Sequence, residues 1–196
     1  LGMMILIFTL IVSYFKDAKD RDKLRKIVQY TAVGILVIYS GITFARVPDW
    51  KDNFTLYQSG VISAPNSARA HAALGSEYRV KAEQSTNPQE KAELYDKAIK
   101  EYTIGGTILP KYVEPFYNLG VIAFAQNDTM KALDYYMKSL DAVPFYRNSL
   151  HNIAVIYLYQ GKIDSSITYL NRILGQYPND NEELINLSYA YLVKKD

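Results

Sequence analysis

The sequence contains no cysteine and almost no excess of charge of either sign. Without cysteine there are no disulfide frameworks, thiolate nucleophiles or cysteine-ligated zinc sites. The formal net charge is +2, and residues 66–196 hold 14 Lys or Arg against 15 Asp or Glu. A nucleic-acid-binding protein needs a basic stripe that displaces counterions from phosphates. We therefore expect a partner other than nucleic acid.

Charge is also missing from two runs near the N-terminus, residues 1–15 and 27–45. At 1.5 Å per residue, the second run spans roughly 28 Å as a helix, close to the ~30 Å hydrocarbon core of a bilayer. We expect two transmembrane helices within residues 1–45. A signal peptide fits less well, because charges follow the first run and no small-residue cleavage site stands after it. The alternative is two buried helices of a soluble protein.

The segment between these runs, residues 16–26, is basic, with six Lys or Arg and three Asp. Short basic loops stay in the cytoplasm by the positive-inside rule. We therefore expect a cytoplasmic loop here and repeats outside: in the periplasm of a bacterium, attached to the inner membrane, or in the ER lumen of a eukaryote. A lipid-binding or nucleic-acid-binding patch is the alternative, although the interleaved aspartates favour the topological role.

The rest of the chain has an internal period, which is marked by the evenly spaced Pro110, Pro144 and Pro178. Their spacing is that of the tetratricopeptide repeat (TPR), a pair of antiparallel helices of about 34 residues. The period predicts an all-α solenoid in which pairs stack into a right-handed superhelix. The predicted units are residues 67–110, 113–144 and 147–178, with a partial unit at 181–196 that supplies a first helix, so we expect the solenoid to continue or to be truncated there.

The first unit departs from the period, because its two halves stand about 11 residues further apart than the repeat allows. The extra residues lie within 81–91, whose centre, Gln84-Ser-Thr-Asn-Pro-Gln89, is a turn signal, whereas residues 90–102 are strongly helical in character. We expect both helices of this pair to be lengthened around a longer loop.

The junction between the second apolar run and the repeats, residues 46–66, carries a distinctive pattern. It begins Arg46-Val-Pro-Asp-Trp-Lys-Asp52 and continues with Leu56-Tyr57 and Ala64-Pro-Asn-Ser-Ala-Arg-Ala-His71, before Leu74-Gly75. Trp50, Phe54 and Tyr57 have the helical spacing of aromatic residues at a membrane interface. The pattern resembles the membrane-to-repeat junction of transmembrane and TPR-containing O-mannosyltransferase-like proteins. The resemblance covers essentially the whole chain, as the C-terminal part of such a protein.

This resemblance implies a parent protein that transfers a sugar from a polyprenyl-phosphate donor to a protein acceptor, with the repeats on the lumenal or periplasmic face. The family's catalytic acidic residue lies in a first outer loop to which no position here corresponds. The resemblance therefore implies a repeat domain that presents or docks protein acceptors. No paired carboxylates, metal-ligand set or nucleophile-base arrangement has a spacing that secondary structure would bring together, so we predict no catalytic residue, cofactor or metal site in this chain. The alternative is a non-enzymatic, membrane-anchored scaffold for an envelope protein complex.

Candidate binding residues follow the repeat. Asn118, Asn152 and Asn186 recur at the repeat period, at position 6 of the first helix of successive units. These helices line the concave face of a TPR solenoid, and a carboxamide can both donate to and accept from the backbone of an extended peptide. We predict a peptide site made of these three residues, assisted by Tyr117, His151 and Tyr159. The alternative is a structural role, in which the amides link neighbouring helices.

The two histidines are the remaining candidates for chemistry. His71 falls at position 4 of the first unit, a seam position, and packing is favoured there over ligation. His151 falls at position 5, on the concave side, where it could contact a ligand or be a solvated groove residue.

Overall fold

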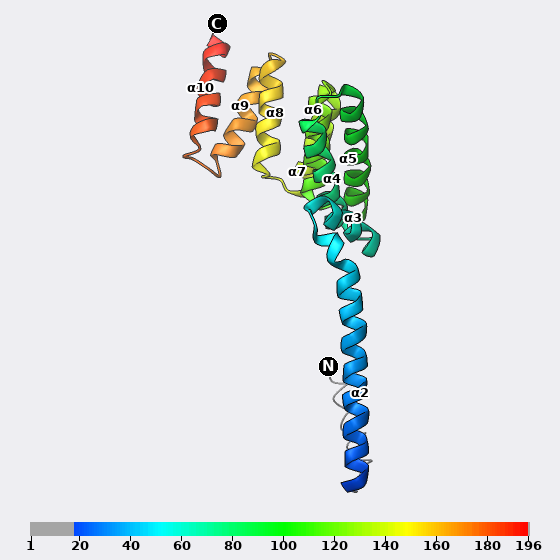
Figure 1. The fold of residues 1–196 in the computed structure, drawn as a ribbon. Coiled ribbons are helices and arrows are strands. Elements are labelled where there is room, and N and C mark those ends of the chain that lie inside the picture. The colour runs from blue at the N-terminus through cyan, green and yellow to red at the C-terminus, as the bar shows by residue number, and fades with distance from the viewer. Residues whose placement is uncertain (1–17, 196) are drawn as a thin grey trace. The chain divides into compact units, whose positions relative to one another are not determined.

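The computed structural model describes residues 18–195, and the chain divides after Lys51 into two units (Figure 1). Every regular element in the described range is helical. The first unit holds the long helix α2 (Ala18–Arg46) and the short 3-10 helix η1 (Val47–Trp50).

Helix α2 is, within the described residues, the one helix long and apolar enough to cross a bilayer. The apolar stretch lies in Asp22–Ala45, near the N-terminus, and its most apolar window has a mean hydropathy of 1.7 and no buried residue. Signal sequences share this length and composition, so membrane anchoring by α2 remains a prediction. The other predicted span, residues 1–15, lies outside the described residues.

The prediction of a loop at residues 16–26 is wrong for the part that the structure describes. Helix α2 begins at Ala18 and continues into the apolar run. Neither proline nor glycine occurs between residues 18 and 33 to interrupt it, and Lys26 Nζ lies 3.4 Å from Asp22 Oδ2, one helical turn away. Charged residues with good helix propensity therefore extend the apolar helix instead of ending it.

The second unit is a series of helices joined by short connections. Their bounds are α3 (Asn53–Ser63), α4 (Ala68–Gln84), α5 (Pro88–Ile108), α6 (Val113–Ala125), α7 (Thr129–Ala142), α8 (Arg147–Tyr159), α9 (Ile163–Leu174) and α10 (Asn181–Lys195). Helices α4, α6 and α8 pack against α5, α7 and α9, and each pair packs on the next. Below, α4, α6, α8 and α10 are the A helices and α5, α7 and α9 the B helices. The prediction of an all-α fold of stacked helix pairs is confirmed.

The core of each pair lies in the seam between its A and B helices. Tyr102 of α5 and Tyr136 of α7 are at most 1% exposed, and the alanines one turn before them, Ala98 and Ala132, are fully buried. Large rings beside small residues let the helices approach closely, as the repeat pattern requires.

Equivalent turns join the A and B helices of the second and third pairs. Asn127 and Gly161 occupy corresponding positions of these two repeats, and both have positive φ, 62° and 72°. This left-handed conformation favours glycine and asparagine over other residues. The same backbone turn thus recurs at the repeat period.

The first pair accommodates its additional residues by lengthening both helices. Helices α4 and α5 have 17 and 21 residues, against 13 and 14 for α6 and α7. The expected longer loop is absent, because only residues 85–87 separate α4 from α5. Asn87 caps α5 by accepting hydrogen bonds from the backbone amides of Gln89 and Glu90, and Pro88 takes the first helical position.

Helix α3 covers α4. The Phe54 ring meets Tyr78 edge-on with 5.3 Å between centroids, and Lys81 Nζ lies 3.4 Å from the centroid of Phe54. Asp52 caps α3 by accepting a 2.8 Å hydrogen bond from the backbone amide of Thr55. The spacing of Phe54 was that of an aromatic residue at a membrane interface, but in the structure its ring packs on the first repeat.

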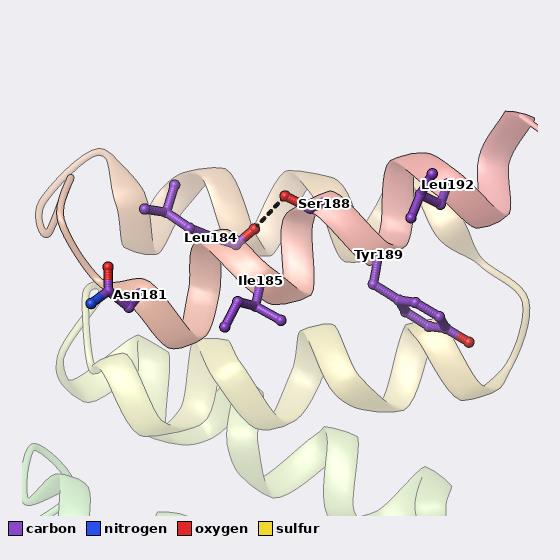
Figure 2. Close-up of a pocket in the computed structure, with 6 residues that line it drawn as sticks. All are labelled: Asn181, Leu184, Ile185, Ser188, Tyr189 and Leu192. Atoms are coloured by element: carbon purple, nitrogen blue, oxygen red, sulfur yellow. Dashed lines mark hydrogen bonds between the residues drawn. The ribbon is translucent and has the colours of Figure 1, made fainter.

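Within the described residues, no B helix follows α10. Leu184, Ile185, Tyr189 and Leu192 are between 41% and 70% exposed. They line a shallow hollow together with Asn181 and Ser188, and all six residues come from α10 itself (Figure 2). The buried Ala190 instead packs α10 against residues of α8 and α9.

Candidate binding sites on the A helices

Polar and aromatic side chains gather around a groove of about 400 Å³ on the A helices, which we call the tyrosine groove. Helices α3, α4 and α6 and the residues that precede α6 and α8 form it. Its lining residues are Tyr57, Arg69, Ala72, Ala73, Ser76, Tyr112, Glu114, Tyr117, Asn118 and Tyr146.

Two tyrosines of this groove occupy equivalent repeat positions. Tyr112 and Tyr146 are the N-cap residues of α6 and α8, with no side-chain capping hydrogen bond. The rings of Tyr117 and Tyr146 meet edge-to-face, with 5.4 Å between their centroids. The centroid of the Tyr117 ring also lies 6.0 Å from that of the buried Tyr136. Tyr117 therefore packs both against Tyr146 and against the core of the second pair.

Small side chains form the opposite wall. Ala72, Ala73 and Ser76 of α4 lie at the repeat positions that Tyr117, Asn118 and Val121 occupy in α6. The difference in side-chain size between the two A helices leaves the space between them open.

Charge in the groove is balanced. Arg69 and Glu114 are its charged lining residues, one of each sign, and both are exposed. The Tyr112 hydroxyl donates a hydrogen bond to Glu114 Oε2. Burial, and after it this hydrogen bond, raises the pKa of the Tyr112 phenol well above its usual 10. The tyrosine therefore stays neutral and acts as a hydrogen-bonding ring.

A second hollow, of about 390 Å³, lies between α8 and α10 and is called the α8–α10 hollow below. Its lining is largely apolar, with one carboxamide and two phenols. The residues are Val155, Leu158, Tyr159, Asn186, Tyr189 and Val193.

The structure divides the six predicted site residues among different surroundings. Tyr117 and Asn118 line the tyrosine groove, whereas Tyr159 and Asn186 line the α8–α10 hollow. The expected single row of groove residues is thus split into two separate hollows. The remaining two, His151 and Asn152, line neither of them.

The three asparagine side chains have different neighbours within the protein. Asn118 Nδ2 donates to the carbonyl oxygen of Glu114, one turn back, at 2.9 Å. Asn186 Nδ2 donates to Glu183 Oε2 at 3.2 Å. The Asn152 side chain lies near the Tyr136 phenol and opposes the rise in pKa that burial imposes on that phenol. Asn152 therefore has a structural contact, while Asn118 and Asn186 keep their carboxamides at the edge of a hollow.

His151 belongs to an ionic cluster that joins the third and fourth units. Its Nδ1 lies 2.7 Å from Oε1 of Glu183, a carboxylate with no exposed surface. The Arg147 guanidinium contacts three carboxylates: its Nε lies 2.7 Å from Asp180 Oδ2, and its Nη2 lies 2.9 Å from Glu182 Oε2 and 3.3 Å from Glu183 Oε1. The cluster satisfies a buried charge across a repeat boundary.

Within the described residues, the same cluster brings together three side chains whose donor atoms have the spacing of metal ligands. One ligand atom each from His151, Glu182 and Glu183 lies within 4.8 Å of the others. The Arg147 guanidinium contacts both carboxylates, however, and supplies the positive charge that a metal ion would bring. The arrangement suits an ion-pair network better than metal binding.

His71 lies in the seam of the first pair and is 5% exposed. Its Nδ1 lies 2.6 Å from Glu101 Oε2, and its Nε2 lies 2.9 Å from the carbonyl oxygen of Pro65. Because a carbonyl oxygen can only accept, Nε2 carries a proton. Both ring nitrogens are thus engaged, which leaves no free nitrogen for a ligand.

Of the lining residues of the tyrosine groove, the sequence predicted only Tyr117 and Asn118 as site residues. It did not identify Tyr57, Arg69, Ala72, Ala73, Ser76, Tyr112, Glu114 and Tyr146. A signal for two of them was present, because Tyr112 and Tyr146 each follow a periodic proline by two positions. Tyr57 and Arg69 carry no comparable mark, since their place depends on how α3 and α4 pack.

Comparisons with known proteins agree with this architecture. Residues 148–180 match the family model described as the tetratricopeptide repeat. The crystal structure of TTC0263, a thermophilic TPR protein of Thermus thermophilus, is similar with a TM-score of 0.61 and 17% sequence identity, over 88% of this chain and 98% of that chain.

Two crystal structures of MamA are similar with a TM-score of 0.58 and 18% identity. They cover 72% and 81% of this chain and 77% and 82% of their own chains. None of the curated proteins matches this sequence. At these identities, the likeness to the solved structures concerns the fold alone.

Proposed function

We propose that this tetratricopeptide-repeat protein binds an extended stretch of another protein on the face formed by its A helices. The observation that carries the proposal is the tyrosine groove, where tyrosines, two exposed residues of opposite charge and a carboxamide surround an open space of about 400 Å³. Surfaces that combine aromatic rings with a few polar groups are typical of protein-binding sites. Repeat solenoids use such extended surfaces for binding.

The asparagines have a narrower role in this proposal than the sequence suggested. Asn118 and Asn186 each have a carboxamide oxygen and a second amide hydrogen beyond the hydrogen bond described above. They are therefore able to pair with peptide groups of a ligand in their two hollows. Asn152 instead supports Tyr136 in the core of the second pair.

The test is a titration of the full chain, in detergent micelles, against fluorescently labelled, reduced and carboxymethylated α-lactalbumin, a permanently unfolded polypeptide. A net hydrogen bond contributes about 0.5–1.5 kcal/mol, so replacing Asn118 and Asn186 together by alanine should weaken binding by about 1–3 kcal/mol. The matched control is Asn171→Ala, on an exposed site of the B helix α9. If the double variant keeps both its affinity and its helicity, Asn118 and Asn186 do not contribute to binding.

The setting of this binding face is a separate proposal. The basic residues between positions 16 and 26 favour a cytoplasmic location for the start of α2, which would place the repeats in the periplasm or the ER lumen. The apolar, unburied surface of α2 supports anchoring by this helix.

Two kinds of partner fit a membrane-anchored binding domain. The partner could be the protein acceptor of a membrane glycosyltransferase, or a component of an envelope complex for which the chain is a scaffold. The first proposal rests on the junction residues 46–75 alone, because the comparisons concern the repeats and give no support to membership of the O-mannosyltransferase-like family. Both proposals use the same polypeptide-binding face.

A further inference from the structure

We infer that the tyrosine groove takes a neutral, proline-rich segment in the polyproline II conformation, an inference that rests on the proposed function and specifies its partner. The groove offers aromatic rings on one wall, small side chains on the other and no net charge. Each of these three properties favours a proline-rich ligand over other extended polypeptides.

The aromatic wall suits pyrrolidine rings. Tyr57, Tyr112, Tyr117 and Tyr146 all line the groove, and the edge-to-face contact between Tyr117 and Tyr146 fixes the angle between two of these rings. Polyproline II segments present a side chain on the same face every third residue, and aromatic-lined grooves are their usual receptors. Their preformed backbone also costs little conformational entropy on binding.

The hydrogen-bonding groups suit a chain that is poor in donors. Proline has no backbone amide hydrogen, so a proline-rich segment offers mainly carbonyl acceptors. The guanidinium of Arg69, the second amide hydrogen of Asn118 and the phenols other than Tyr112, which donates to Glu114, are donors that such carbonyls can accept from. An extended chain of ordinary residues would also bring amide hydrogens that need acceptors.

The charge balance argues against an acidic or basic tail. Arg69 and Glu114 are of opposite sign, and the carboxylate of Glu114 already accepts a hydrogen bond from Tyr112. A highly charged ligand would meet an unfavourable partner at one of these two residues. Ala72 and Ala73, on the opposite wall, leave room for a neutral chain close to the helix backbone.

The experiment measures fluorescence anisotropy of two labelled peptides of equal length, decaproline and a glycine-serine sequence, with the full chain in detergent micelles. We expect decaproline to bind at least about tenfold more tightly, the effect of one well-packed contact. Two variants should weaken its binding by about tenfold each: Tyr117→Ala, which removes a ring, and Ala73→Arg, which fills the groove from the other wall. The matched control, Tyr177→Ala, removes a half-exposed ring after α9 and should leave binding unchanged.

Tyr117 also packs against the core, so circular dichroism must show that each variant keeps its helicity, and Ala73→Arg gives the test independently of Tyr117. Equal affinity for the two peptides, or decaproline binding that Ala73→Arg leaves unchanged, overturns the inference. If unfolded α-lactalbumin still binds in that case, the proposed function stands without the proline preference. If neither α-lactalbumin nor decaproline binds, both proposals fail.

Discussion

Gly120 of α6 lies directly against the ring of Tyr136 of α7: a Cβ atom placed on this glycine would come within 2.5 Å of the ring. Such a distance is far below van der Waals contact, so the ring would have to move. Tyr136 is 1% exposed and packs in the core of the second and third pairs. The packing of the Tyr136 ring against α6 therefore depends on the absence of a side chain at residue 120.

Gly120→Ala should destabilise the fold, because overpacking a tight core costs about 1–3 kcal/mol. A thermal melt followed by circular dichroism should show a midpoint lower by several degrees. Gly60→Ala, in α3, is the matched control, since nothing lies within 4 Å of a Cβ atom there. It should leave the melt unchanged or raise it slightly, because alanine favours helix. Equal melts for the two variants would contradict the tight approach.

Glu101→Leu should destabilise the first pair, because it leaves His71 Nδ1 without its partner in a buried seam. An unsatisfied buried polar group costs about 1–3 kcal/mol. Glu101→Gln should recover most of this loss, since its amide can donate to Nδ1. The control is Glu93→Leu, which makes the same kind of change at an exposed position of the same helix. A melt of Glu101→Leu that matches this control would show that the pair contributes nothing to stability.

The ion pair of Arg147 with Asp180 should make stability depend on pH at the acidic end. The hydrogen bond from Arg147 is the main cause that lowers the pKa of Asp180 below its usual 3.8. A carboxylate with a lowered pKa in the folded state stabilises the fold above its unfolded pKa, and this stabilisation is lost as the pH falls through the folded value. Asp180→Asn should therefore melt earlier than the unsubstituted chain at pH 7, and the difference should shrink below about pH 4. A constant difference from pH 7 to pH 3 would contradict this account.

The topology prediction can be tested with single cysteines, because the chain has none of its own. Cysteines placed at the exposed positions Lys100 and Asp141 should react with a membrane-impermeant thiol reagent in intact cells or spheroplasts. A cysteine in place of Ala18 should react only after permeabilisation. The reverse labelling pattern would place the repeats in the cytoplasm.

The sequence predicted the helix pairs because their constraints are local and recur. The prolines at 110, 144 and 178 stand at the same position of successive units. In the structure, the left-handed turn residues Asn127 and Gly161 recur at the same period. The predicted loop at residues 16–26 was wrong from residue 18 onward because charge marks exposure to water, whereas the end of a helix needs a capping or breaking residue.

The site was less predictable, because its residues compete for partners within the protein. The carboxamides of Asn118, Asn152 and Asn186 occupy equivalent positions. Asn118 donates to a backbone carbonyl and Asn186 to a carboxylate, whereas Asn152 lies near the Tyr136 phenol. His151 pairs with Glu183 of the following unit. The repeat period gives the position of a side chain on its helix, and its hydrogen bonds depend on neighbours that differ from unit to unit.

Hydrogen–deuterium exchange of the full chain, with and without saturating unfolded α-lactalbumin, tests most directly whether the A helices form the binding face. The account predicts slower exchange in segments 68–76 of α4 and 112–118 at the start of α6, which line the tyrosine groove. Exchange in the B helices α5 and α7 should change little. Protection confined to α5 and α7, or no protection anywhere in residues 52–195 despite saturable binding, would contradict it.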